Sequence, residues 1–107
     1  MNKKLAIIIA SDKYLNYISG LICASAKKKD ISVSIFITDK GVFLTENKEF
    51  ISLIKKYTAN IDKVSVCEYS CAVNKISSRI EGFNYASQFE NAKMINGLEE
   101  KDRALLF

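Results

Sequence analysis

The sequence contains no histidine and no proline, and only four of its 107 residues are glycine. Without histidine, the chain cannot form a hydrolase triad in which histidine is the base. The glycines are scattered, and no glycine-rich turn of the kind that cradles phosphate follows the first apolar run. These absences exclude histidine-based hydrolysis and leave nucleotide or flavin binding without a supporting residue. The absence of proline means that no candidate strand or helix is interrupted.

Cysteine is also scarce, with three residues at positions 23, 67 and 71. An odd number argues against a secreted disulfide framework. Two cysteines four residues apart, without histidine or a second pair, do not complete a tetrahedral zinc set. We therefore expect no metal and no other cofactor.

Long apolar runs are missing too. The run at residues 5–10 is short and is followed at once by polar residues, so we expect neither a signal peptide nor a membrane span. Together with reduced thiols, this predicts a cytoplasmic protein. The formal net charge of +4 is mild, and its lysines, such as Lys27 and Lys55, fall near expected helix ends. No basic stripe interleaved with aromatic residues occurs, so we expect no nucleic-acid partner.

Short runs rich in β-branched residues indicate buried strands. Such runs occur at residues 4–10, 31–38, 63–67 and 103–107. Residues 81–87 are ambiguous and form either a short further strand or an ordered loop.

Helical patterns fall between these runs, at about residues 12–29, 47–59, 69–77 and 88–97. Ser11 or Asp12 is expected to cap the first helix and Gly97 to end the last one. Residues 39–42 have the composition of a turn.

Strands that alternate with helices specify a parallel sheet covered on both faces. We therefore predict one domain over residues 1–107, an α/β three-layer sandwich with a mainly parallel sheet of about five strands and flavodoxin-like alternation. Sites in such sheets form beyond the carboxyl ends of the strands. Ser11, Asp39, Gly41 and Cys67 should consequently gather at one edge.

Cys67 is the principal candidate site residue, because it ends a β-branched run where a helix is expected to begin. Backbone amides at such a place can favour the thiolate without help from histidine. The alternative is a small buried residue that only packs. Cys71 lies one turn further on, as a candidate resolving thiol or a packing residue, and Cys23 is expected to be core filler on the first helix.

Several segments, in this order along the chain, resemble the DsrE/DsrF-like family, which includes the TusD, TusC and TusB sulfur-relay subunits. They are residues 39–42 (DKGV), 64–67 (VSVC) with the helix that holds Cys71 and Lys75, 80–87 (IEGFNYAS) and 102–107 (DRALLF). The resemblance covers nearly the whole chain. Lys75 is the one positive charge retained where the family has a basic pair, and Glu68 adds a negative charge beside Cys67.

The resemblance implies a single DsrE-like domain that assembles into trimers or hexamers, or into hetero-oligomers with related subunits. It also implies that Cys67 carries a persulfide in an active member, with sulfur donor and acceptor proteins as partners. Asp39, Gly41, Tyr69 and Lys75 would then shape or flank the binding site.

Two functions are compatible with these observations. In the first, the chain is a sulfur-relay subunit and candidate sulfurtransferase, in which the Cys67 thiolate accepts sulfane sulfur and passes it on. In the second, the chain is a non-catalytic oligomeric binding or assembly module, in which Cys67 is packed or only redox-sensitive.

Overall fold

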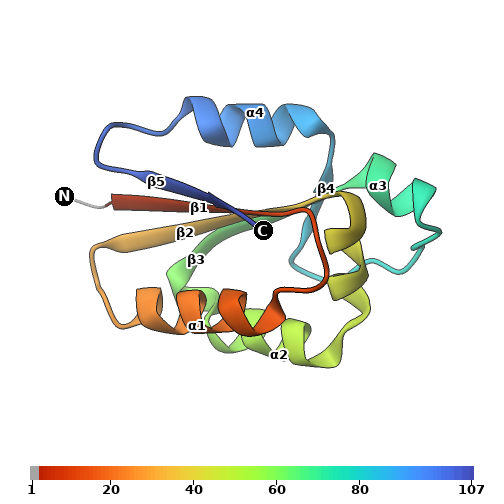
Figure 1. Ribbon diagram of the computed structural model, residues 1–107, viewed down its shortest axis with the longest axis horizontal. Coiled ribbons are helices and arrows are strands. Elements are labelled where there is room, and N and C mark those ends of the chain that lie inside the picture. Colours follow the sequence, from red (N-terminus) through yellow and green to blue (C-terminus); the bar gives the residue numbers. More distant parts are fainter. Residues whose placement is uncertain (1–2) are drawn as a thin grey trace.

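The computed structural model describes residues 3–107. Within that range a single sheet lies between helices on both of its faces (Figure 1). Its five strands run parallel in the order β4-β3-β2-β1-β5. The strands are β1 (Lys3–Ile9), β2 (Ile31–Ile37), β3 (Ile61–Cys67), β4 (Asn84–Ala86) and β5 (Arg103–Leu106). The predicted α/β class with a parallel sheet of about five strands is confirmed.

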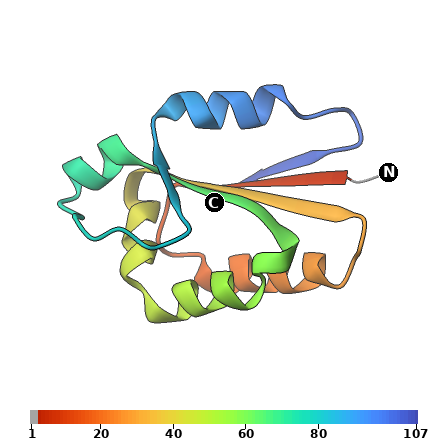
Figure 2. The same ribbon diagram turned by 180° about the vertical axis from the view of Figure 1, so that it is seen from behind.

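The strand order explains which helix covers which face. From β1 to β4 each strand is laid down on the same side of the previous one, and right-handed crossovers then keep α1 (Leu15–Ala26) and α2 (Lys48–Lys56) on one face. The chain then returns across the whole sheet to place β5 beside β1, so α4 (Gln88–Asn96) covers the opposite face, as Figure 2 also shows. The predicted three-layer sandwich is the result.

The apolar core lies on the side of α1 and α2. Alternate strand residues such as Ile7, Ile35 and Val66 point into it and are almost fully buried. The other face, towards α4, is markedly more polar. It carries Ser32, Ser34, Ser65 and Cys67.

One predicted local feature is wrong, and a second is more extensive than expected. The first helix begins at Leu15, and its N-cap is Tyr14, without a side-chain cap hydrogen bond. The Ser11 hydroxyl instead accepts the backbone N–H of Lys13 at 3.2 Å, so it closes a local turn before the helix. The segment expected to be a simple turn at residues 39–42 continues as a 3-10 helix, η1 (Asp39–Glu46).

The helix after Cys67 is shorter than expected. It is α3 (Glu68–Val73), and it ends because Lys75 adopts a left-handed conformation with φ +59°. A further 3-10 turn, η2 (Thr58–Asn60), precedes β3. The ambiguous residues 81–87 contain strand β4, whose Asn84 and Ala86 pair with Ser65 and Cys67.

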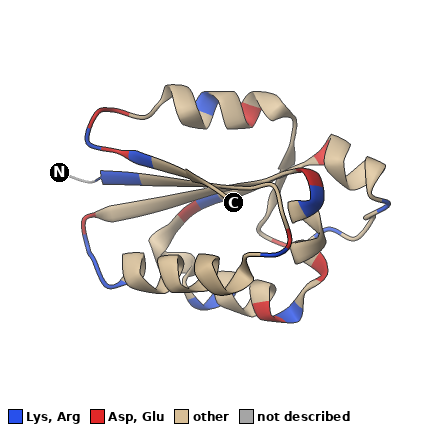
Figure 3. Ribbon diagram, in the orientation of Figure 1, with Lys and Arg blue, Asp and Glu red and all other residues tan. Residues whose placement is uncertain are grey.

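Charged residues of both signs are interspersed in Figure 3, and several lie on loops at the end of the sheet where β1 and β5 begin. Among the residues that the structure describes, no helix is both long and apolar enough to cross a membrane.

Candidate functional site

At the carboxyl ends of β3 and β4, the connections of the chain switch from one face of the sheet to the other. The loop that follows α3 lies on the side of α1 and α2, where its Ile76 and Phe83 pack on the core, whereas α4, which follows β4, lies on the other side (Figure 2). Adjacent strands whose connections diverge in this way mark the place, beyond their carboxyl ends, where open α/β sheets bind ligands. Cys67 is the last residue of β3 and pairs with Ala86 of β4, so it lies at this place in the topology.

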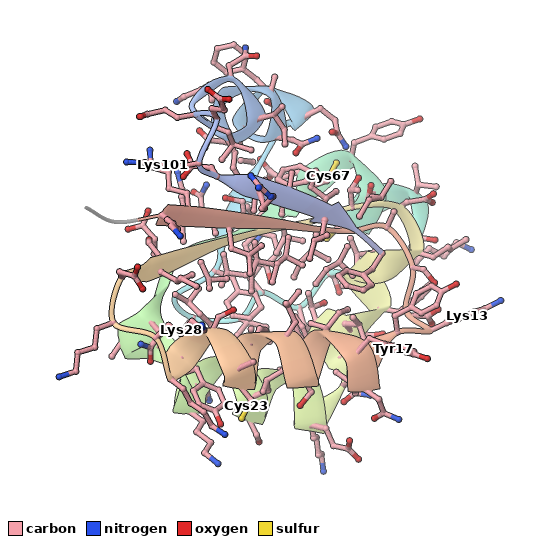
Figure 4. The ribbon with its side chains drawn as sticks, turned by 60° about the vertical axis from the view of Figure 1, so that its left-hand side comes forward. Lys13, Tyr17, Cys23, Lys28, Cys67 and Lys101 are labelled. Atoms are coloured by element: carbon pink, nitrogen blue, oxygen red, sulfur yellow. The ribbon has the colours of Figure 1, made fainter. Side chains whose placement is uncertain are left out.

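Cys67 is held there as the N-cap of α3. Its φ and ψ are −70° and 114°, and its Sγ accepts the backbone N–H of Ser70 at 3.4 Å. The side chain is on the α4 side of the sheet, and Figure 4 shows it well separated from Cys23 on α1. Only 1% of Cys67 is exposed. The expected strand-end placement is therefore present, but the sulfur is covered.

Polar groups surround this sulfur. Gln88, the first residue of α4, donates from Nε2 to Cys67 Sγ at 3.6 Å and to Thr38 Oγ1 at 2.7 Å. Thr38 Oγ1 lies 3.2 Å from Ser70 Oγ, which also accepts the backbone N–H of Asp39 at 2.8 Å. The ends of β2, β3 and β4 thus each contribute to one hydrogen-bonded group around Cys67.

The pattern of donors and acceptors favours an anionic sulfur. The hydroxyl oxygens of Thr38 and Ser70 each already accept an N–H, from Gln88 and Asp39 respectively. One hydroxyl proton can bridge the pair, and the other is free to point to Sγ. The sulfur is therefore surrounded by groups arranged to donate, which suits a thiolate better than a thiol.

Two opposing effects act on the pKa of the Cys67 thiol. Burial is the largest single effect and raises the pKa. Hydrogen bonds from the hydroxyl and backbone N–H of Ser70, from Thr38 and from Gln88 together outweigh burial, so the pKa lies below its ordinary value. The hydrogen bonds thus favour the thiolate form of Cys67 without help from a histidine.

Cys71 has a different environment. It is 6% exposed and belongs to the apolar core cluster on the side of α1 and α2. Burial and the nearby Cys67 raise the pKa of its thiol, with Arg79 acting weakly in the other direction. A hollow of about 530 Å³ adjoins it, lined by Tyr69, Arg79, Tyr85 and neighbouring residues of α3 and the following loop. The raised pKa keeps the Cys71 thiol protonated, and a protonated thiol is a poor nucleophile. The ionisation of Cys71 therefore does not support its predicted role as a resolving thiol.

Asp39 and Gly41 lie at the same edge and act through the backbone. The positive φ of Asp39, 48°, directs its N–H to Ser70. A Cβ on Gly41 would overlap the carbonyl oxygen of Ile9 and come within 2.8 Å of the Ile9 carbonyl carbon. Only glycine therefore allows η1 to lie against the end of β1 and hold Asp39 in place.

The other predicted residues lie farther from the sulfur. Tyr69 is 77% exposed and forms part of the hollow beside Cys71. Lys75 is exposed and terminates α3. Glu68, which follows Cys67 directly, is paired with Arg79 at 2.7 Å on the surface, so its charge is largely balanced there.

Sequence reasoning missed Thr38, Ser70 and Gln88. Ser70 had a usable signal, because a residue three positions after an N-cap is where a capping side chain finds its backbone donor. Gln88 had none, because its proximity to Cys67 depends on β4 pairing with β3. Within residues 3–107, no three His, Cys, Asp or Glu side chains converge as a metal site would require.

Comparison with known proteins identifies the fold. No protein-family model and no curated protein matches the sequence. Among solved structures, the YchN protein from E. coli, a DsrE-like protein, superimposes with a TM-score of 0.74 at 13% identity, covering 100% of both chains. MTH1491, a protein of unknown function from Methanobacterium thermoautotrophicum, gives the same TM-score and identity over 99% of this chain and 100% of its own. The architecture expected from the family resemblance is confirmed at the level of the fold.

Proposed function

For this chain with the DsrE/YchN-like fold, we propose the function of a sulfur-relay subunit that carries sulfane sulfur as a persulfide on Cys67. The observation that carries the proposal is the hydrogen-bonded group of Thr38, Ser70 and Gln88 around the Cys67 sulfur, at the carboxyl ends of β3 and β4. Groups arranged to donate stabilise the thiolate, which is the nucleophile in sulfur transfer.

The transfer consists of two displacements. The Cys67 thiolate attacks the outer sulfur of a donor persulfide, a new S–S bond forms, and the donor sulfur leaves as a thiolate. An acceptor thiolate then attacks the outer sulfur on Cys67, and Cys67 leaves as the thiolate that began the cycle. No oxidant or reductant is consumed, because sulfane sulfur changes carriers without a net change in oxidation state.

The hydrogen-bond donors serve both displacements. In the first step they keep Cys67 ionised, and in the second they stabilise the thiolate that departs. A lowered pKa makes Cys67 a better leaving group than an ordinary cysteine, so the site is suited to passing sulfur on as well as accepting it. Cys71, with its raised pKa, acts here as a packing residue, although release of sulfide by a Cys67–Cys71 disulfide stays a prediction.

The burial of Cys67 favours the second function, the non-catalytic assembly module. With 1% of the residue exposed, no partner thiol reaches the sulfur in the arrangement described. The two functions differ in a single observable, which is whether sulfur from a donor persulfide arrives on Cys67.

The test is intact mass spectrometry after incubation with glutathione persulfide. The wild-type protein should gain a mass of about 32 Da, one sulfur atom, and lose it again when a thiol acceptor is added. Cys67→Ser should show no such gain, and the matched control Cys23→Ser should behave as wild type. A wild type without the adduct, or a Cys67→Ser variant that keeps it, would reject sulfur transfer and leave the assembly module.

The proposal also covers the cellular compartment and the oligomeric state of the protein. Persulfide chemistry with three free thiols requires a reducing compartment, for which we propose the cytoplasm. Large exposed apolar side chains on β5 and α4, including Leu106 at 71% and Phe89 at 68%, are available for contacts between copies of the chain. The proposed trimer or hexamer is tested by light scattering coupled to gel filtration.

A further inference from the structure

The side chains that cover the sulfur of Cys67 differ in how exposed they are and in how firmly they are held. Ser70 is itself 7% exposed and is tied to the backbone of Asp39. Thr38 is half-buried at the end of β2. Gln88 alone among the three hydrogen-bonding neighbours is exposed, so rotation of its side chain requires no displacement of the core.

Two hydrogen bonds hold the Gln88 side chain over the sulfur. They use the same nitrogen, whose two protons go to Thr38 Oγ1 and to Cys67 Sγ. Because an exposed amide exchanges such bonds for bonds to water, each contributes only modestly to the closed position. The closed and open positions of this side chain therefore differ by a small free energy.

The helix that carries Gln88 has no buried residue, although Phe36 on the sheet face beneath it is only 1% exposed. A cavity of about 260 Å³ separates α4 from the sheet and is lined in part by Ser32, Ser34 and Ser65. An ion pair between Lys63 of β3 and Glu90 of α4 crosses this gap at 2.9 Å, and both side chains are partly exposed. The first turn of α4 thus lies next to Cys67 without a buried apolar side chain of its own.

We propose that Gln88 is the gate of the Cys67 thiol. In the closed position its side chain shields the sulfur and donates to it. In the open position the amide turns to solvent, and the sulfur becomes accessible from beyond the carboxyl ends of β3 and β4. The purpose of the gate rests on the proposed function, because a thiol that transfers sulfur has to be reached although it is buried. The claim that Gln88 controls access to the sulfur is separate from sulfur transfer itself.

The gate predicts two separable effects of Gln88→Ala. Loss of the cover raises the limiting rate at which the Cys67 thiolate is alkylated at high pH, by about tenfold, the factor expected when one or two modest hydrogen bonds no longer close the site. Loss of the donor raises the pH at which half of Cys67 reacts. Substitution of a residue with only a structural role would not raise both the limiting rate and the pH midpoint of Cys67 alkylation.

The experiment measures alkylation of the full chain by iodoacetamide over a range of pH. Peptide mapping by mass spectrometry assigns the modification to Cys67 separately from Cys23 and Cys71. Gln88→Asn, which is one methylene too short to bridge both partners, should resemble Gln88→Ala. Gln88→Glu keeps the shape but lacks the N–H and adds a negative charge, so it should move the pH midpoint upwards further than Gln88→Ala does.

Asn96→Ala is the matched control, because Asn96 is an exposed amide side chain on the same helix, at the end of α4 away from Cys67. It should leave both quantities at their wild-type values. Far-ultraviolet circular dichroism melts verify that each variant is folded. A limiting rate for Gln88→Ala within about twofold of wild type, in a folded protein, overturns the gate.

The two proposals fail independently. Iodoacetamide reports access and ionisation without any persulfide, so the gate is supported or overturned whatever the mass experiment on sulfur transfer shows. Conversely, a sulfur adduct on Cys67 with an unchanged alkylation rate in Gln88→Ala supports the relay and rejects the gate.

Discussion

Cys67 and Ser70 are joined within one turn of the chain: the backbone N–H of Ser70 donates to Cys67 Sγ at 3.4 Å. The hydroxyl of the same serine accepts the N–H of Asp39 at 2.8 Å and contacts Thr38. Ser70 therefore connects the sulfur to the end of the neighbouring strand β2. This relationship makes Ser70 the first position at which to test the site.

Ser70→Ala removes the hydroxyl and keeps the backbone N–H. Because the hydroxyl of Ser70 lowers the pKa of the Cys67 thiol, we expect the pH midpoint of Cys67 alkylation to rise in this variant. The measurement is the same pH series with iodoacetamide. Ser78→Ala, an exposed serine in the loop after α3, is the matched control and should not shift the midpoint.

The two cysteines around α3 should titrate in a fixed order. Burial raises the pKa of the Cys67 thiol, but the hydrogen bonds lower it by more, whereas burial and the nearby Cys67 raise the pKa of Cys71. As the pH increases, Cys67 should therefore reach half of its limiting alkylation rate first. Peptide mapping over the pH series reads both sites in one sample. The reverse order would contradict the donor arrangement described around Cys67.

Gly41 should be essential for stability. A Cβ at this position overlaps the carbonyl of Ile9, so Gly41→Ala forces η1 away from β1 at a cost of about 1–3 kcal/mol in the free energy of unfolding. Gly20 provides the control, because a Cβ there meets nothing within 4 Å in the middle of α1. Gly20→Ala should stabilise the protein by about 0.5–1 kcal/mol through helix propensity. Urea unfolding measures both, and an equal effect of the two substitutions would refute the close approach.

Asp102 should make the protein sensitive to acid. Its carboxylate accepts the backbone N–H groups of Glu99 and Lys4, each at 2.8 Å, and these bonds lower its pKa. A lowered folded pKa means that the stabilisation is present above the unfolded pKa of about 3.9 and is lost as the pH falls through the lower folded value. Thermal melts from pH 6 down to pH 2 should therefore show a smaller loss for Asp102→Asn than for wild type. Parallel curves for the two proteins would argue against this origin.

The fold could be predicted because its signals are local. β-branched runs such as residues 31–37 identify strands, and their alternation with helices specifies a parallel sheet. The error at the first helix came from a competing local hydrogen bond. Ser11 or Asp12 was expected to cap α1, but the Ser11 hydroxyl accepts the N–H of Lys13 and the helix starts only at Leu15.

The site was only partly predictable. The place of Cys67 at a strand end follows from the sequence, because its run of apolar residues stops there. Its neighbours Thr38 and Gln88 are 29 and 21 positions away in the chain, and their contact with the site depends on the order β4-β3-β2. Strand order is set by the packing of the whole sheet, and no short pattern encodes it.

The placement of β5 beside β1 has a consequence for the order of folding. β1 pairs with β2 across a single helical connection, whereas its pairing with β5 joins residues 98 positions apart, such as Leu5 and Arg103. Because closing a longer loop costs more entropy, we expect β5 to dock after β1 and β2 have paired, and the hydrogen bond from the Phe107 N–H to the Ile8 carbonyl at 2.8 Å to form at that late step.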